Sequence, residues 1–242
     1  MADRHKVFLS YPVMDRCEQR SLSSVYRMAS TCQTASVQVS CLEGDSLISR
    51  VRNVAITMFL ESNCDYFMSV DSDLDIMNVL PDNNAIDRLI RSDYEFSGAL
   101  YALKDPRERK SSSVLMGANS IPKFDSGFHE ARWLSTGFWM LKRSVAEKMS
   151  KAYPELWYDG DAHAVGRQCF GGYIPYIESV SEADGFKFPD GKMIYRKYLS
   201  EDWAFTARWR KIGGKVWVDS GIHLVHIGKQ GYKLWDCEVR QA

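Results

Sequence analysis

Strand-like and helix-like patterns alternate along the first hundred residues, and this alternation restricts the fold more than any other feature. Strands are predicted at residues 6–10, 36–42, 65–70 and 95–100, and helices at 18–30, 46–61 and 85–91. Strands that alternate with helices form a parallel sheet with right-handed crossover connections. We therefore expect an α/β protein with a central, mostly parallel sheet flanked by helices.

The second half of the chain carries shorter elements. Strands are predicted at 113–116, 130–134, 137–141, 215–218 and 223–226, and helices at 144–152 and 200–212. Residues 153–190 are rich in aromatics and lack a clear period; a loop of this length in a compact domain commonly serves as a lid. No stretch resembles a linker, so we expect one domain over residues 1–242, with two unequal halves that meet near residue 103.

Composition narrows the classes of partner and compartment. Lys plus Arg and Asp plus Glu both count 31, so the basic excess typical of nucleic-acid binding is missing. No apolar run approaches the ~20 residues of a membrane span, and residues 7–9 are too short a run for a signal peptide. The six cysteines form no CxxC pair, which favours reduced thiols. We expect a soluble cytoplasmic protein, in the host cytoplasm if the chain is viral, without a membrane span or a nucleic-acid partner.

An acidic triplet, Asp71-Ser72-Asp73, follows the third predicted strand. Ligands of open parallel sheets bind at the carboxyl ends of the strands. Two carboxylates separated by one residue can both reach a hard cation such as Mg²⁺ or Mn²⁺, which bridges protein carboxylates to substrate phosphates. The alternative is that Asp71 and Asp73 only make turn hydrogen bonds.

A second acidic pair opens the helix predicted at 200–212. Ser200 is a good N-cap, and Glu201 and Asp202 in the first turn are favoured by the helix dipole, so a purely structural role is available. The same dipole keeps a carboxylate ionised, which suits a general base that deprotonates a hydroxyl. Further on, His223 and His226 lie in the strand predicted at 223–226, where a lone histidine is commonly an ordinary buried residue.

Taken in order along the chain, these motifs resemble those of a known enzyme family. They are Arg50-Val51-Arg52-Asn53, then Asp65-Tyr66 leading to Asp71-Ser72-Asp73, then Thr136-Gly137, then Glu201-Asp202, and finally His226-Ile227-Gly228. The set resembles the GT-A glycosyltransferases, in particular inverting, family-2-like enzymes, and is similar to the compact glycosyltransferases of large algal DNA viruses.

The resemblance implies a GT-A fold, the Rossmann-like fold of nucleotide-diphospho-sugar transferases, with a nucleotide-binding half at 1–103 and an acceptor-binding half at 104–242. It implies that Asp73 is the main ligand of Mn²⁺ or Mg²⁺ and that His226 completes the metal shell. Asp71 would contact the ribose or a metal-bound water. Asp202 would be the catalytic base, with Glu201 orienting the acceptor or the site.

The resemblance also suggests a set of donor-binding residues. Ser10, Tyr11 and Pro12 would hold the nucleotide base, and Glu43 and Asp45 would contact the base edge or the ribose. Arg50 or Arg52 would bind the phosphates or hold the acidic cluster. Ser72 would contact the donor beside Asp71 and Asp73, and Thr136 and Gly137 would lie near the donor sugar. Each also has a structural alternative as a turn residue, a core aromatic or part of an exposed helix face.

The expected function is metal-dependent, inverting transfer of a hexosyl or pentosyl group from a UDP- or GDP-sugar to a hydroxyl of a glycan or glycoprotein. One alternative is a non-catalytic nucleotide-sugar or carbohydrate-binding module, which would not need Asp202. The other is a sugar nucleotidyltransferase, which usually has a glycine-rich phosphate loop after the first strand. Residues 10–16 contain no glycine.

Overall fold

The computed structural model describes residues 4–105, 107, 110–117, 122–158, 176–180 and 185–234. Its helices are α1 (Gln19–Thr31), α2 (Ile48–Glu61), α3 (Ala85–Arg91), α4 (Arg143–Ala152), the 3₁₀ turn η1 (Pro154–Leu156) and α5 (Glu201–Lys211). Its strands are β1 (His5–Val13), β2 (Ala35–Glu43), β3 (Tyr66–Val70), β4 (Leu74–Ile76), β5 (Val79–Leu80), β6 (Asn83–Asn84), β7 (Phe96–Ala99), β8 (Val114–Leu115), β9 (Phe128–Trp133), β10 (Phe138–Lys142), β11 (Tyr176–Ser179), β12 (Phe186–Lys187), β13 (Met193–Ile194), β14 (Arg196–Leu199), β15 (Trp217–Asp219), β16 (Leu224–Ile227) and β17 (Gly231–Lys233).

An eight-stranded sheet forms the centre of the protein, in the order β2-β1-β3-β10-β7-β15-β9-β8. The pairs β1–β2, β1–β3 and β7–β15 are parallel, as the alternation of strands and helices predicts. Strand β10 lies antiparallel between β3 and β7. Strand β9 is antiparallel to β15. The expectation of a mostly parallel central sheet is confirmed.

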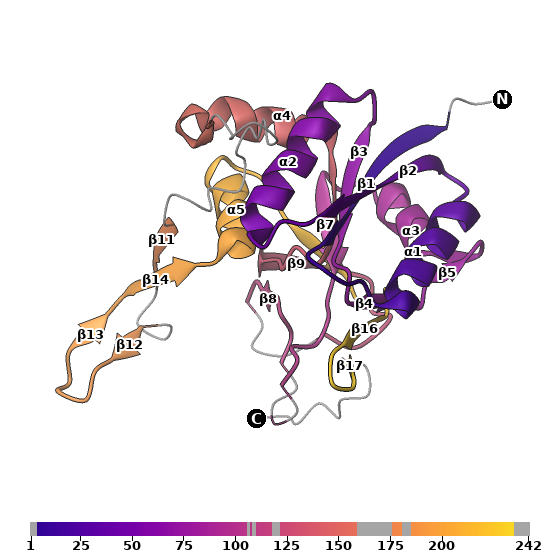
Figure 1. Ribbon diagram of the computed structural model, residues 1–242. Coiled ribbons are helices and arrows are strands. Elements are labelled where there is room, and N and C mark those ends of the chain that lie inside the picture. The colour runs from indigo at the N-terminus through magenta and orange to yellow at the C-terminus, as the bar shows by residue number, and fades with distance from the viewer. Residues whose placement is uncertain are drawn as a thin grey trace.

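Helices cover both faces of this sheet, with α1 and α3 on one side and α2, α4 and α5 on the other (Figure 1). Successive side chains of a strand point to opposite faces. In β1, accordingly, Val7 and Leu9 belong to the core under α1 and α3, whereas Phe8 packs into the core under α2, α4 and α5. None of the described helices is both long and apolar enough to cross a membrane.

Among the described residues, four smaller sheets lie outside the central one, and one of them is the pair β5–β6. Strands β17, β16 and β4 form a sheet that joins residues 224–233 to the segment directly after Asp73. The pairs β11–β14 and β12–β13 form an arm that projects from the body of the protein (Figure 1). The description of 153–190 as irregular is therefore wrong at 154–156, 176–179 and 186–187, where η1, β11 and β12 lie. Residues 159–175 and 181–184 of that segment fall outside the described residues.

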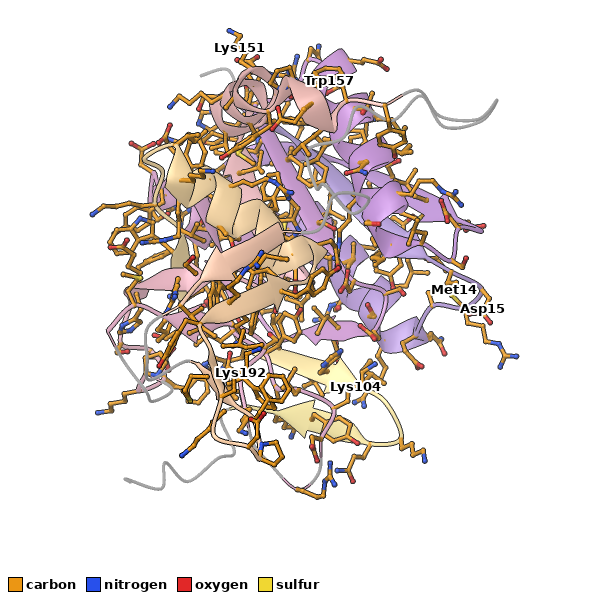
Figure 2. The ribbon with its side chains drawn as sticks, turned by 90° about the vertical axis from the view of Figure 1, so that its left-hand side faces the viewer. Met14, Asp15, Lys104, Lys151, Trp157 and Lys192 are labelled. Atoms are coloured by element: carbon orange, nitrogen blue, oxygen red, sulfur yellow. The ribbon has the colours of Figure 1, made fainter. Side chains whose placement is uncertain are left out.

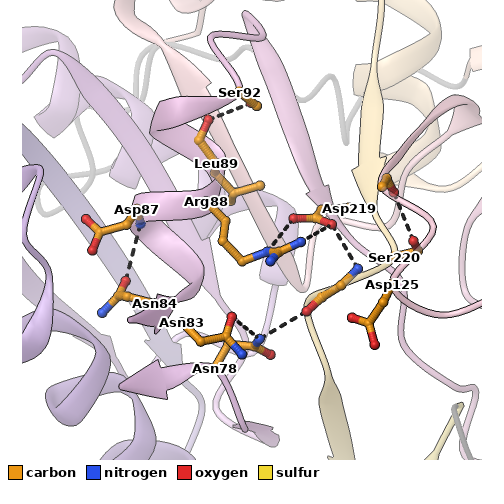
Figure 3. A network of polar contacts seen from close by, with 12 residues as sticks. Asn78, Asn83, Asn84, Asp87, Arg88, Leu89, Ser92, Asp125, Asp219 and Ser220 are labelled. Carbon is orange, nitrogen blue, oxygen red and sulfur yellow. Dashed lines mark hydrogen bonds and ion pairs between the residues drawn. The ribbon is translucent and has the colours of Figure 1, made fainter. Parts of the chain in front are cut away.

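A buried polar network ties α3 to β15, away from the acidic motifs (Figure 3). The guanidinium of Arg88 donates to both carboxylate oxygens of Asp219, at 2.7 and 2.9 Å, and the Asp219 side chain is fully buried. Asp219 also accepts from the backbone N–H of Gly221 at 2.8 Å, and the Asn78 amide donates to the Gly221 carbonyl at 3.0 Å. This network therefore joins α3 and β15 to Asn78, which follows β4.

Candidate functional site

A cleft opens at the carboxyl ends of the parallel strands β1 and β3. One wall is the end of β1, and the other consists of the start of α2 and the acidic triplet after β3. Its lining residues are Pro12, Val13, Met14, Asp45, Ser46, Ile48, Val51, Asp71, Ser72 and Asp73. Figure 2 shows Met14 at the outer edge of the protein. This is the edge of the sheet where the topology predicts a ligand site.

Arg52 of α2 joins the two acidic motifs. Its Nη2 atom donates to both carboxylate oxygens of Asp71, at 2.9 and 3.2 Å, and its Nη1 donates to Glu201 at 2.6 Å. Only 5% of the Arg52 side chain is exposed. Glu201 and Arg52 are 149 positions apart in the sequence, so this ion pair brings the start of α5 to the acidic triplet.

Burial sets the proton affinities of the two carboxyl groups that face Arg52. Burial raises the pKa of Asp71, and the positive charge of Arg52 opposes this rise. Burial likewise raises the pKa of Glu201, again against the charge of Arg52. The charge of Arg52 therefore opposes the effect of burial on the pKa of both carboxyl groups.

The Thr136-Gly137 turn packs against Asp71 from the side of β10. The backbone N–H of Asp71 donates to the Gly137 carbonyl at 2.8 Å, and the Gly137 N–H donates to the Tyr101 hydroxyl at 3.2 Å. A Cβ atom at position 137 would lie 2.5 Å from the Tyr101 hydroxyl oxygen and 2.9 Å from Asp71 Oδ2. The turn thus requires glycine because a side chain would collide with the acidic triplet.

Gly137→Ala is expected to disturb this contact. The added methyl group must push Tyr101 or Asp71 aside, and overpacking of this kind costs about 1–3 kcal/mol of stability. Urea unfolding should show the loss. Gly127→Ala is an informative comparison, because its Cβ would meet nothing within 4 Å but its φ of +91° is strained for alanine. A loss at Gly137 no greater than ~0.5 kcal/mol would contradict the predicted collision.

Asp73 lies between a lysine and a histidine. Its Oδ2 atom is 2.5 Å from Nζ of Lys104 and 3.5 Å from Nε2 of His226. Burial acts to raise the pKa of Asp73, but the hydrogen bonds from His226 and Lys104 outweigh it and lower the pKa to about 2. The backbone carbonyl of Asp73 also accepts from Ile227 N–H at 2.7 Å, which fixes β16 beside the triplet.

Asp73 and His226 fit a divalent cation in spacing and orientation. Nδ1 of His226 lies 2.8 Å from the Ala102 carbonyl oxygen. A carbonyl only accepts, so Nδ1 carries a proton, and Nε2 is the ring nitrogen that faces Asp73. Two ligands at about 2.1 Å from one cation can be 3.5 Å apart.

The predicted trio of metal ligands is not arranged as one preformed cluster. Both oxygens of Asp71 contact Arg52 rather than the space between Asp73 and His226. Within the described part of the chain, no group of three or more His, Cys, Asp or Glu side chains is placed to hold a metal ion. The fit therefore concerns Asp73 and His226, with the remaining ligands left to substrate phosphates and water.

Asp202 lies at the start of α5, next to Glu201. Its Oδ1 atom accepts from the backbone N–H of Trp203 at 2.7 Å and from the hydroxyl of Ser200. Ser200 is the N-cap residue, but its side chain makes no capping bond to the helix backbone and contacts Asp202 instead. The Asp202 side chain is only partly buried, so a ligand can reach it.

Of the donor-binding residues predicted from the sequence, five line the cleft: Pro12, Asp45, Asp71, Ser72 and Asp73. Tyr11, expected to hold the nucleotide base, is fully buried and does not line the cleft, and its hydroxyl bonds to the Ser21 hydroxyl at 3.0 Å. Ser10 and Thr136 are also buried. Glu43 is exposed at the end of β2 and does not line the cleft. The guanidinium of Arg50 donates to Asp45, which lines the cleft.

Lys104 was not predicted from the sequence. It follows the carboxyl end of β7 by five residues, and residues at that end of a parallel strand face the ligand edge. That position is the signal that could have found it, but a single lysine in a charged loop is common. Tyr101, three residues before Lys104, is buried with its hydroxyl against Gly137, and burial raises the pKa of Tyr101.

Comparison with solved structures finds three informative similarities. The A197 protein from STIV aligns with a TM-score of 0.57 and 15% identity, over 97% of this chain and 92% of that chain. A putative glucose-1-phosphate thymidylyltransferase from Bacillus anthracis, in complex with a sucrose, aligns with a TM-score of 0.36 and 9% identity, over 62% and 75% of the two chains. A glycosyltransferase involved in the glycosylation of the major capsid of PBCV-1 aligns with a TM-score of 0.35 and 11% identity, over 69% and 74%.

The A197 alignment extends over nearly the whole of both chains, and at this identity it shows a shared fold and not an activity. No protein-family model and no curated protein matches this chain. The chain thus shares with A197 an α/β fold, and its own mostly parallel central sheet is flanked by helices on both faces.

Proposed function

We propose that the chain is an inverting, metal-dependent glycosyltransferase that moves a hexosyl or pentosyl group from a UDP- or GDP-sugar to a hydroxyl of a glycan or glycoprotein. The single observation that carries the proposal is the Asp71–Arg52–Glu201 bridge. It unites the acidic triplet at the cleft with the acidic pair of α5, and transfer needs both a place for the diphosphate and a base for the acceptor.

In this proposal each group has a separate task. The cleft between β1 and the acidic triplet takes the nucleoside diphosphate, and Asp73 and His226 hold Mn²⁺ or Mg²⁺ beside it. The bound cation would neutralise the charge of the leaving diphosphate. Asp202 takes the proton of the acceptor hydroxyl, which is a poor nucleophile until a positioned carboxylate removes it. Arg52 keeps the two acidic motifs together, and Glu201 orients the acceptor or the site.

The direct test is a screen of UDP- and GDP-sugars for release of nucleoside diphosphate with and without Mn²⁺. Metal-stimulated release supports the proposal. Absence of both release and binding for every donor would contradict it. Formation of a nucleotide sugar from a nucleoside triphosphate and a sugar 1-phosphate would instead identify a nucleotidyltransferase.

Asp73→Ala is expected to remove the metal-dependent part of nucleoside diphosphate binding. Outer-shell partners of a metal typically contribute 10–100-fold in affinity, and loss of a direct ligand should cost at least about that much. Calorimetry of UDP and GDP with and without Mn²⁺ measures the difference. Asp75→Ala is the matched control, because Asp75 lies two residues on and faces Arg20, 3.9 Å away, instead of His226. Equal affinity of the parent protein with and without Mn²⁺ would refute the metal site.

A further inference from the structure

Lys104 is held in a defined position by its surroundings. The backbone N–H of Leu103 donates to the Lys110 carbonyl at 2.9 Å, and Ala102 forms a β-bridge with Ser111. The two residues before Lys104 are therefore paired with residues 110 and 111. A Cβ atom added at Gly228 would lie 3.2 Å from Cδ of Lys104. The stem of Lys104 therefore passes close over Gly228, beside the yellow β16–β17 hairpin in Figure 2.

The ammonium group of Lys104 sits on the oxygen that a divalent cation would need. Asp73 Oδ2 is the atom that contacts Nζ of Lys104, and it is also the atom that faces Nε2 of His226. A carboxylate oxygen with an ammonium at 2.5 Å is less available to a metal ion. Lys104 and a cation held by Asp73 therefore compete for one position.

The cleft is acidic, yet its proposed ligand is an anion. Asp45, Asp71 and Asp73 all line it. Arg50 is paired with Asp45, and the buried Arg52 contacts two carboxylates at once. Lys104 contacts Asp73, and 36% of its side chain is exposed, so its ammonium can turn toward a phosphate at the cleft.

We propose that Lys104 is a tethered cation that rests on Asp73 in the free protein and moves to the diphosphate of the donor when a divalent cation takes its place on Asp73. This inference rests on the proposed function, because it requires a nucleoside diphosphate in the cleft. The inference assigns phosphate binding to Lys104, which lies outside the sequence motifs described above. It also implies that, without nucleotide, the protein binds the metal ion more weakly than Asp73 and His226 would in the absence of Lys104.

The test compares Lys104→Met with Lys104→Arg, which keeps the charge, and with Lys229→Met, which removes a neighbouring exposed lysine of the β16–β17 turn. In saturating Mn²⁺, Lys104→Met should lower the affinity for UDP or GDP by about tenfold to 100-fold, the loss expected for a hydrogen bond to a charged group. With Mn²⁺ alone, the same variant should bind the ion about two- to fivefold more tightly, because a partly exposed ion pair no longer competes.

Both effects are required, and Lys229→Met should show neither. Unchanged UDP and GDP affinity of Lys104→Met in saturating Mn²⁺ would overturn the phosphate contact. Unchanged Mn²⁺ affinity would overturn the competition. Failure of the parent protein to bind UDP and GDP under any condition would instead overturn the proposed function. Circular dichroism and the melting temperature confirm that each variant is folded.

Discussion

Asp202→Asn is expected to lower turnover by about 10²–10⁴-fold, which is the usual contribution of a general base. Asparagine retains a carbonyl oxygen that can accept from Trp203 N–H, so the start of α5 should remain intact. Asparagine cannot take a proton from the acceptor hydroxyl. The loss should therefore appear in kcat and leave donor binding nearly unchanged. The measurement is release of nucleoside diphosphate from the donor that the screen identifies.

Two further variants separate the base from its surroundings. Ser200→Ala removes the hydroxyl that contacts Asp202 and leaves the carboxylate, so turnover should change far less than in Asp202→Asn. Glu201→Gln weakens the pair with Arg52 and should affect stability as well as rate. If Asp202 only serves the helix dipole, its asparagine variant would lose about 0.3–1 kcal/mol of stability and keep near-normal turnover. That pattern would transfer the role of base to Glu201.

The sequence predicts the central sheet well because its signals are local. Segment 85–91 has a helix-start residue before it, and α3 begins there with the Asn84 side chain accepting from Ile86 and Asp87 N–H. The short strands were harder to find. Strand β4 follows Asp73 and pairs with β16, about 150 residues later, so a pairing partner distant in sequence creates it. A strand of three residues is too short to show an alternating pattern of apolar and polar residues in the sequence.

The same distinction applies to the site. We could identify the acidic triplet, the acidic pair and His226 because each belongs to a short motif of neighbouring residues. What each carboxylate faces depends on contacts between distant segments. Asp71 faces Arg52, whereas Asp73 faces Lys104 and His226, although both aspartates belong to one triplet. The burial of Tyr11 likewise depends on distant contacts, since its hydroxyl bonds to Ser21 of α1 and its ring packs in the core.

Arg52→Met is expected to cost about 3–5 kcal/mol of stability, which is typical when one partner of a buried ion pair is removed. Methionine leaves Asp71 and Glu201 facing each other without a positive charge between them. Arg50→Met is the matched control on the same helix. The Arg50–Asp45 pair is 35% exposed on the arginine side, so its loss should cost only about 0–1 kcal/mol. The urea unfolding midpoints of the two variants measure the difference.

A charge argument identifies the cause of that loss. If it arises from uncompensated carboxylates, adding Asp71→Asn and Glu201→Gln to Arg52→Met should restore part of the stability, because no buried charge then remains at the bridge. Arg52→Lys should fall between the parent and Arg52→Met, since one ammonium cannot reproduce the two separate guanidinium contacts. This variant remains informative if Arg52→Met does not fold. An Arg52→Met protein as stable as Arg50→Met would show that the bridge does not hold the acidic motifs together.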